Sequence, residues 1–149
     1  MFACTARILA AFTLSAVAGC GTTATTGEEK PPPTEAQRRL IAIGDAYVRA
    51  TAKLNRPPNN VNELIPFLKP IGKPEELLKS PEDNQNFEIV YGSMLIGSKA
   101  TGSEMPIVAY EKSGKDGKRN VLRGVSDTLL MTATELKSAK FPDGYRLPF

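Results

Sequence analysis

The sequence predicts an α+β fold in which an N-terminal amphipathic helix packs on a small antiparallel sheet. Apolar residues recur at helical spacing through residues 34–54, and after residue 86 the pattern changes to short apolar runs separated by turn residues. The dipeptide Asp116-Gly117 stands between two of these runs, as in a tight hairpin. Roughly 115 residues can bury enough apolar surface for one core, so we expect a single α+β domain at residues 34–149.

The first helix is predicted at residues 34–54. Thr34 and Gln37 have the spacing of a capping box and follow directly after three prolines. An apolar stripe then recurs at steps of three and four residues, and it consists of Leu40, Ile43, Tyr47, Thr51 and Leu54. Charged residues fall largely on the other side, so we expect this helix to pack on a core and not to span a membrane.

Shorter elements follow the first helix. Asn60 is the expected N-cap of a helix over residues 61–68, Pro74 the first residue of one more helical turn, and residues 80–84 a turn. Strands are expected at residues 87–91, 106–111, 120–123 and 128–131, with an irregular segment at 93–105 and a turn at Ser126-Asp127. Thr132 and Glu135 repeat the capping-box spacing and open a last helix, which we expect to end near Lys140. The tail at 141–149 either lies over the domain or frays.

Residues 1–19 have the pattern of a bacterial lipoprotein signal peptide. Arg7 precedes an apolar run at residues 8–18, which as a helix would be only about 16 Å long, too short for a bilayer. The run ends in Val17-Ala18-Gly19-Cys20, which resembles the lipobox. This resemblance implies that Cys20 receives a diacylglyceryl group, that cleavage follows Gly19, and that the new amino terminus is acylated, for example with palmitate. The other interpretation is an ordinary signal peptide with a chance cysteine.

Residues 20–33 are expected to be a flexible, proline-rich tether. They consist mainly of small polar residues, charges and a proline triplet, and such a segment cannot bury apolar surface. The thirteen residues 21–33 reach roughly 20 Å from the lipid. In lipoproteins of Gram-negative bacteria, an aspartate directly after the lipidated cysteine signals retention in the inner membrane. This chain has Gly21 at that position. The resemblance therefore favours the outer membrane, with the domain facing the periplasm.

The composition excludes several kinds of chemistry. The chain contains no histidine, so it has neither a Ser-His or Cys-His catalytic pair nor a His-ligated zinc site. It contains two cysteines, of which Cys4 would leave with the signal peptide and Cys20 would carry lipid. A net charge of only +3 and an envelope location argue against nucleic acid as a partner. We expect no cofactor and no small-molecule substrate.

Three stretches resemble the globular part of type II secretion major pseudopilins and the related pilin-like proteins of planctomycetes. They are PPNNVNELIPFL at residues 57–68, LLKSPEDNQNFEIVYG at 77–92 and PIVAYEKSGKDGKRNVLRGVSDTLLMTATELK at 106–137. The resemblance implies a pilin-like head. The chain departs from pilins in having a lipobox and a tether where the apolar filament segment would stand. It also has Val125-Ser126-Asp127-Thr128 where relatives often carry Asp-Gly-Ser-Val.

Three groups of residues are candidates for a site. Because major pseudopilins bind calcium in a late loop, the resemblance makes Glu82, Asp83, Asp116 and Asp127 candidate metal ligands; the other interpretation is a solvated turn. The second group is a basic hairpin that carries Lys112, Lys115, Lys118 and Arg119. It is a candidate contact for anionic lipid, for an anionic polymer or for a protein partner. The other interpretation is a solvated tip that protects a sheet edge from aggregation. Two carboxylate pairs would suit glycoside hydrolysis, namely Glu111 with Asp116 and Glu135 with Asp127.

These observations together predict a non-enzymatic, lipid-anchored envelope protein. Its head would have a structural or interaction role, with an envelope or secretion-apparatus protein as partner. Two alternatives stay open at this point. One is a carboxylate-based hydrolase acting on envelope glycans, and the other is a true pseudopilin subunit.

Overall fold

The computed structural model describes residues 31–97 and 99–148. The predicted signal peptide, most of the tether and the predicted lipidation site Cys20 therefore lie outside the described residues. All of the described helices and strands belong to one compact unit, Pro32–Phe149. None of the described helices is both long and apolar enough to cross a bilayer.

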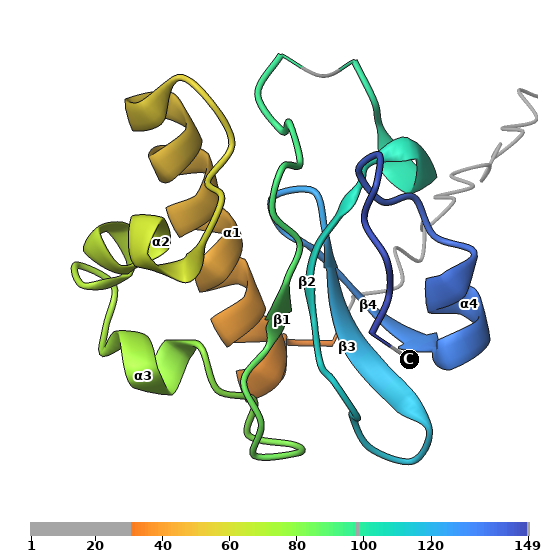
Figure 1. Ribbon diagram of the computed structural model, residues 1–149. Helices are drawn as coiled ribbons and strands as arrows, with labels where there is room; N and C mark the ends of the chain where they lie inside the picture. The colour runs from red at the N-terminus through yellow and green to blue at the C-terminus, as the bar shows by residue number, and fades with distance from the viewer. Residues whose placement is uncertain (1–30, 98, 149) are drawn as a thin grey trace, which may run out of the picture. The chain divides into compact units, whose positions relative to one another are not determined.

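Four antiparallel strands form a sheet in which neighbours in sequence are neighbours in space (Figure 1). The sheet order is β1-β2-β3-β4, with bounds Glu88–Ile89, Ile107–Tyr110, Lys118–Arg123 and Asp127–Thr132. Helices accompany this sheet on both sides (Figure 1). The prediction of an α+β fold is therefore confirmed.

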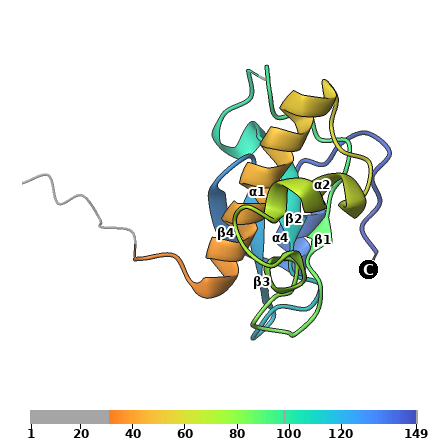
Figure 2. The ribbon, with the colours of Figure 1, turned by 90° about the vertical axis from the view of Figure 1, so that its left-hand side faces the viewer.

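Three helices lie on one face of the sheet (Figures 1 and 2). They are α1 (Glu35–Leu54), α2 (Val61–Leu68) and α3 (Pro74–Leu77). The predicted caps are present: Thr34 and Gln37 form a capping box, and the Asn60 side chain accepts from the Glu63 amide. The buried stripe of α1 packs with the sheet and α2 in a first apolar cluster, which includes Leu40, Ile43, Tyr47, Leu64, Leu68, Ile89 and Leu122.

The opposite face of the sheet is also covered, which the sequence analysis did not predict. Helix α4 (Ala133–Lys137) and the C-terminal tail pack there (Figure 1). A second apolar cluster joins Val90, Ile107, Tyr110, Val121 and Leu136 to Phe141, Tyr145 and Leu147 of the tail. The domain thus has three layers, and the tail lies over the sheet instead of fraying.

A bulge in β2 places two consecutive side chains of this strand in the same cluster. Ile107 pairs with Arg123 but Ala109 pairs with Leu122, so Val108 is an extra residue in β2. As a result Val108 and Ala109 belong to the first cluster, whereas Ile107 belongs to the second. All four residues of β2 are buried.

Several predicted boundaries were wrong by a few residues. The strand expected at 87–91 is regular only at Glu88–Ile89. Val90 N still donates to the Val108 carbonyl oxygen at 2.8 Å, and the chain then turns at Gly92, whose φ of 84° is left-handed. Asp127 opens β4 instead of lying in the preceding turn, and β3 begins at Lys118. Helix α4 ends at Lys137, short of the expected Lys140. The irregular segment contains a short 3-10 turn, η1 (Gly102–Glu104).

Helix α1 approaches the β3–β4 turn closely at Gly44. A Cβ atom added to Gly44 would lie 2.2 Å from the carbonyl oxygen of Val125 and 3.0 Å from Leu122 Cδ2. The first of these neighbours is backbone and cannot move aside as a flexible side chain would. The absence of a side chain at residue 44 therefore sets the distance between α1 and the sheet.

We predict that Gly44→Ala destabilises the domain, although alanine stabilises a helix by about 1 kcal/mol relative to glycine. The added methyl group must push α1 from the sheet, and such overpacking costs about 1–3 kcal/mol. Urea unfolding measures the change in the free energy of unfolding. Ala52→Gly, at an exposed position of the same helix, is the control and should cost about 1 kcal/mol. A Gly44→Ala variant that is more stable than wild type would contradict the close contact between α1 and the β3–β4 turn.

Candidate functional site

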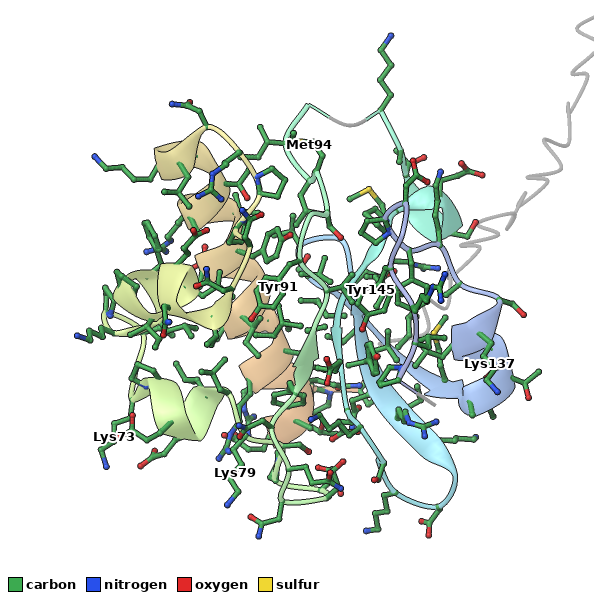
Figure 3. All side chains as sticks on the ribbon, viewed as in Figure 1. Lys73, Lys79, Tyr91, Met94, Lys137 and Tyr145 are labelled. Carbon is green, nitrogen blue, oxygen red and sulfur yellow. The ribbon has the colours of Figure 1, made fainter. Side chains whose placement is uncertain are left out.

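Most of the predicted site residues gather at one end of the domain. The β2–β3 hairpin and the loop of residues 80–86 meet there, near Lys79 in Figure 3, whereas Met94 lies at the opposite end. The loop carries Glu82 and Asp83, and the hairpin carries Asp116 and the four predicted basic residues. Their partners decide which of these side chains are available to a ligand.

Glu111 is completely buried where the hairpin leaves β2. Its Oε1 accepts from Ser80 Oγ at 2.6 Å, and its Oε2 accepts from the backbone N of Asn120 at 2.7 Å and from Asn120 Nδ2 at 2.9 Å. A buried carboxylate is tolerated only when donors replace the lost water. Glu111 makes no ion pair with a described residue, so these three donors hold it in place. Its oxygens are thereby committed to joining the hairpin to the loop.

Asp83 joins the same two segments from the loop side. Its Oδ2 accepts from the backbone N of Ser113 at 2.9 Å and of Gly114 at 3.1 Å, and its Oδ1 accepts from Gln85 N at 3.0 Å. Burial alone would raise the pKa of Asp83, but these donors outweigh it, so the pKa lies below the usual 3.8. Asp83 is therefore a charged acceptor for the backbone.

The hairpin tip has the geometry that its sequence predicts. Lys115 and Lys118 exchange two backbone hydrogen bonds of 2.8 and 2.9 Å. Between them Asp116 and Gly117 have φ values of 51° and 75°, which is the positive-φ pair of a type I′ turn. The expected Asp-Gly hairpin is confirmed.

The four basic residues of the hairpin differ in their surroundings. Lys112 Nζ lies 3.4 Å from Glu88 Oε2, and Arg119 Nε donates to the Lys112 carbonyl oxygen at 2.8 Å. Lys115 and Lys118 are exposed and make no ion pair with a described residue. They line a cavity of about 400 Å³ together with Thr34, Gln37, Glu82, Asp116, Asn120 and Leu130. Because Glu82 and Asp116 share this cavity, its charge is mixed.

The four candidate metal ligands do not form one group. Asp83 is occupied by three backbone donors, and Asp127 lies at the far end of β3 from the hairpin, opposite Arg123. Asp127 Oδ2 accepts from Arg123 at 2.5 Å, so it is held by an ion pair there. Glu82 and Asp116 are left at the hairpin end. No three acidic or cysteine side chains of the described residues are placed to hold a metal ion.

The carboxylates considered for hydrolysis have structural partners. Glu111 is buried, and Asp127 is paired with Arg123. Glu135 Oε2 accepts from Thr132 N at 2.7 Å in the capping box of α4, and this contact lowers the pKa of Glu135. Each of these three groups is already engaged as an acceptor within the fold.

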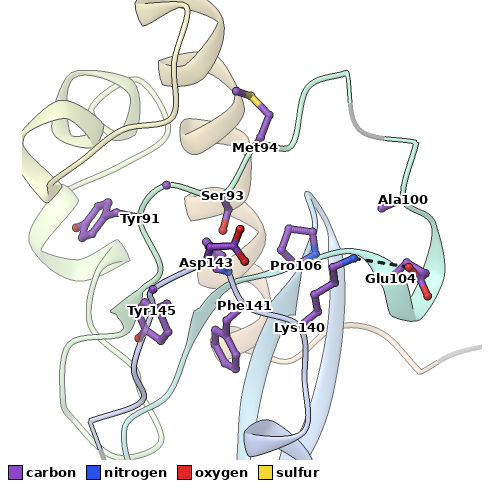
Figure 4. Close-up of a pocket in the computed structure, with 13 residues that line it drawn as sticks. Tyr91, Ser93, Met94, Ala100, Glu104, Pro106, Lys140, Phe141, Asp143 and Tyr145 are labelled. Carbon is purple, nitrogen blue, oxygen red and sulfur yellow. Dashed lines mark ion pairs between the residues drawn. The ribbon is translucent and has the colours of Figure 1, made fainter.

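A larger groove lies at the opposite end of the domain (Figure 4). It has a volume of about 680 Å³ and is lined by residues from 91–94, from 100–106 and from 140–145. No motif in the sequence predicts this groove, because its walls come from the irregular segment and the tail. Their glycines and prolines indicate turns, but not that the two segments meet.

The floor of the groove is fixed by buried hydrogen bonds. Tyr47 Oη of α1 accepts from Ser93 N at 3.0 Å and donates to the Val90 carbonyl oxygen at 3.3 Å. Ser93 Oγ donates to the Ile107 carbonyl oxygen at 3.3 Å. Burial raises the pKa of Tyr47 to about 12, so its hydroxyl is neutral and keeps both roles at physiological pH.

Aromatic contacts fix the tail side of the groove. The rings of Phe141 and Tyr145 are stacked at 5.0 Å, and Phe141 meets Tyr110 edge-on at 6.4 Å. The hydroxyls of Tyr110 and Tyr145 are 2.9 Å apart. Burial raises the pKa of both tyrosines. The tail thus packs as part of the core.

The rim of the groove is polar and open to solvent. Lys140 Nζ lies 3.7 Å from Glu104 Oε2, which bridges the two walls (Figure 4). Asp143 points into the groove near Ser93 and makes no ion pair with a described residue (Figure 4). Met94 at the rim is 53% exposed. The groove is thus an open concave surface that carries both polar and apolar side chains.

We predict that Asp83→Asn lowers the free energy of unfolding at pH 7 by about 1–3 kcal/mol, because an amide leaves backbone donors unmatched. The neighbouring Glu82→Gln is the control and should change it by less than about 0.5 kcal/mol. Because the folded-state pKa of Asp83 is lowered, its stabilisation is present above pH 4 and is lost as pH falls through that pKa. The difference in free energy of unfolding between wild type and Asp83→Asn should therefore become smaller as the pH is lowered. Urea unfolding of both proteins from pH 7 to pH 2 measures this difference. A difference that does not change with pH would contradict the role of the Asp83 charge.

Comparison of the chain with protein-family models, with curated proteins and with solved structures gives no match.

Proposed function

We propose that this chain is a lipid-anchored protein of the bacterial cell envelope whose α+β domain has a structural or interaction role. The observation that carries the proposal is the sequence Val17-Ala18-Gly19-Cys20 at the end of a short apolar run. Lipid on Cys20 would hold the domain at a bilayer, because two or three acyl chains anchor a protein far more firmly than one. Gly21 favours the outer membrane, with the domain in the periplasm.

The arrangement of the described domain is compatible with such an anchor. Prolines precede Thr34, which caps the exposed N-terminal end of α1, so the tether joins the domain at a surface position. Arg38 and Arg49 form ion pairs on the outer side of α1 with Glu35 and Asp45. This helix therefore has a charged outer side, as expected for a domain standing in water.

The use of the acidic side chains favours binding over catalysis. Glu111, Asp83, Asp127 and Glu135 each hold backbone or a guanidinium group. The exposed features are of another kind: the 680 Å³ groove, the basic hairpin and an open sheet edge. Recognition of an envelope or secretion-apparatus protein at one of these surfaces is the role that we propose.

We also propose that the domain is a pilin-like head. What supports this proposal is the order of elements, in which a long capped helix and a short helix precede an antiparallel sheet against which the long helix packs. A true pseudopilin subunit would need an apolar helix for filament packing. The charged outer side of α1 gives no such surface, so an anchored head is favoured over a filament subunit.

Replacing Cys20 tests the proposed anchor. Cys20→Ala should abolish incorporation of labelled palmitate and move the protein from the membrane fraction to the soluble fraction, because the acyl acceptor is lost. Cys4→Ala is the matched control and should leave both measurements unchanged. Membrane association that survives in Cys20→Ala, or a native amino terminus without lipid by mass spectrometry, would contradict the proposal.

A further inference from the structure

Strand β4 is an open edge of the sheet. It is the last strand in the order β1-β2-β3-β4, and it pairs with β3 without a bulge over six residues. On its outer side, the one backbone group bonded to a described residue is Thr132 N, which donates to Glu135 Oε2 at 2.7 Å in the capping box of α4. Figure 2 shows β4 at the margin of the sheet. Before Thr132 this edge presents a row of N–H and C=O groups without a partner among the described residues, which is a template for another strand.

This edge lacks the features by which proteins usually prevent pairing. Asp127–Thr132 contains no proline and no lysine. Its one ionisable residue, Asp127, stands at the end and is neutralised by Arg123. Leu130 in the middle is 59% exposed, more than Met94 at 53% or Ile96 at 45%. Two such edges can approach each other without repulsion between like charges.

The sequence of the strand is self-complementary about Leu130. Residues 128–132 read Thr-Leu-Leu-Met-Thr, so the same classes of side chain recur in both directions. We propose that two copies of this chain associate by antiparallel pairing of their β4 strands, centred on Leu130. In that register Leu130 lies opposite its own copy, Thr128 opposite Thr132, and Leu129 opposite Met131. Such Thr–Thr and apolar pairs across strands are favourable.

The two faces of the sheet also match in this register. Side chains alternate along a strand, so Thr128, Leu130 and Thr132 share one face. Leu130 lines a cavity with Thr34 and Gln37, which places this face on the α1 side. Met131 packs with the second cluster, on the α4 side. A two-fold axis perpendicular to the sheet therefore continues both faces from one copy into the next.

The same axis agrees with attachment of both copies to one bilayer. Because it leaves both α1 helices on one side of the joined sheet, the two tethers would start on that side. Five residue pairs make a small contact, so we expect association to be weak in dilute solution. Confinement at a bilayer raises the local concentration and favours the dimer. This last step rests on the proposed lipid anchor, but the edge pairing itself does not.

A disulfide crosslink tests the register. In the full chain, Leu130→Cys should give a covalent dimer on mild oxidation of membranes, because the two-fold axis places the introduced thiols opposite each other. Ile71→Cys, at an exposed apolar residue near α3, is the matched control. Wild type shows any crosslinking by the chain's own cysteines. We expect at least a fivefold larger dimer fraction for Leu130→Cys than for Ile71→Cys, seen on non-reducing gels with intact mass.

A charge at the centre of the pairing provides a second test. Leu130→Lys would set two ammonium groups opposite each other, and it should lower the association constant of the purified full chain about fivefold or more in sedimentation experiments. Ile71→Lys is the control, and a thermal melt verifies that each variant is folded. Equal crosslinking in both cysteine variants, or a crosslinked product with the mass of another protein, would overturn the inference. Lipid on Cys20 without the Leu130 dimer contradicts the edge pairing alone, whereas the dimer without lipid contradicts only the anchor.

Discussion

A carboxylate that is buried without a cationic partner among the described residues constrains one end of this domain. Glu111 is fully enclosed, and it is stable there only while Ser80 and Asn120 supply donors to both of its oxygens. The loop that carries Ser80 must therefore be docked on the hairpin, and Asp83 strengthens the docking by accepting from two hairpin amides. The hairpin leaves β2 at a fixed angle as a consequence. Removing either side of this arrangement would leave buried polar groups unmatched.

This constraint shapes what the domain has to offer a partner. At the hairpin end Glu111 and Asp83 accept from backbone donors. The groove at the other end is built from the irregular segment and the tail, on a floor held by Tyr47 and Ser93. Between these ends the sheet is covered on both faces. Its open side is the β4 edge. Surfaces for recognition thus lie at the periphery of a rigid core, in keeping with an anchored module.

Local signals in the sequence predicted local structure well. The capping residues Thr34, Asn60 and Thr132 and the turn at Asp116-Gly117 were all confirmed, because each acts within a few residues of its own position. Features that depend on distant contacts were not predicted. The tail covers the second face through rings far apart in sequence, and the β2 bulge is defined only by the pairing of β2 with β3. Ser80, one of the two residues that donate to the buried Glu111, comes from another segment. The groove lined by residues 91–94, 100–106 and 140–145 depends on the same kind of long-range packing, so no sequence motif predicts it.

Amide hydrogen exchange at Asn120 tests the central constraint most directly. The backbone N–H of Asn120 donates to the Glu111 carboxylate at 2.7 Å and not to a main-chain carbonyl. If that carboxylate fixes the hairpin, this amide should exchange as slowly as that of Val121 in the buried part of β3, and Glu111→Ala should release it. Exchange of the Asn120 amide in the wild type as fast as that of Gly117 at the hairpin tip would contradict the account.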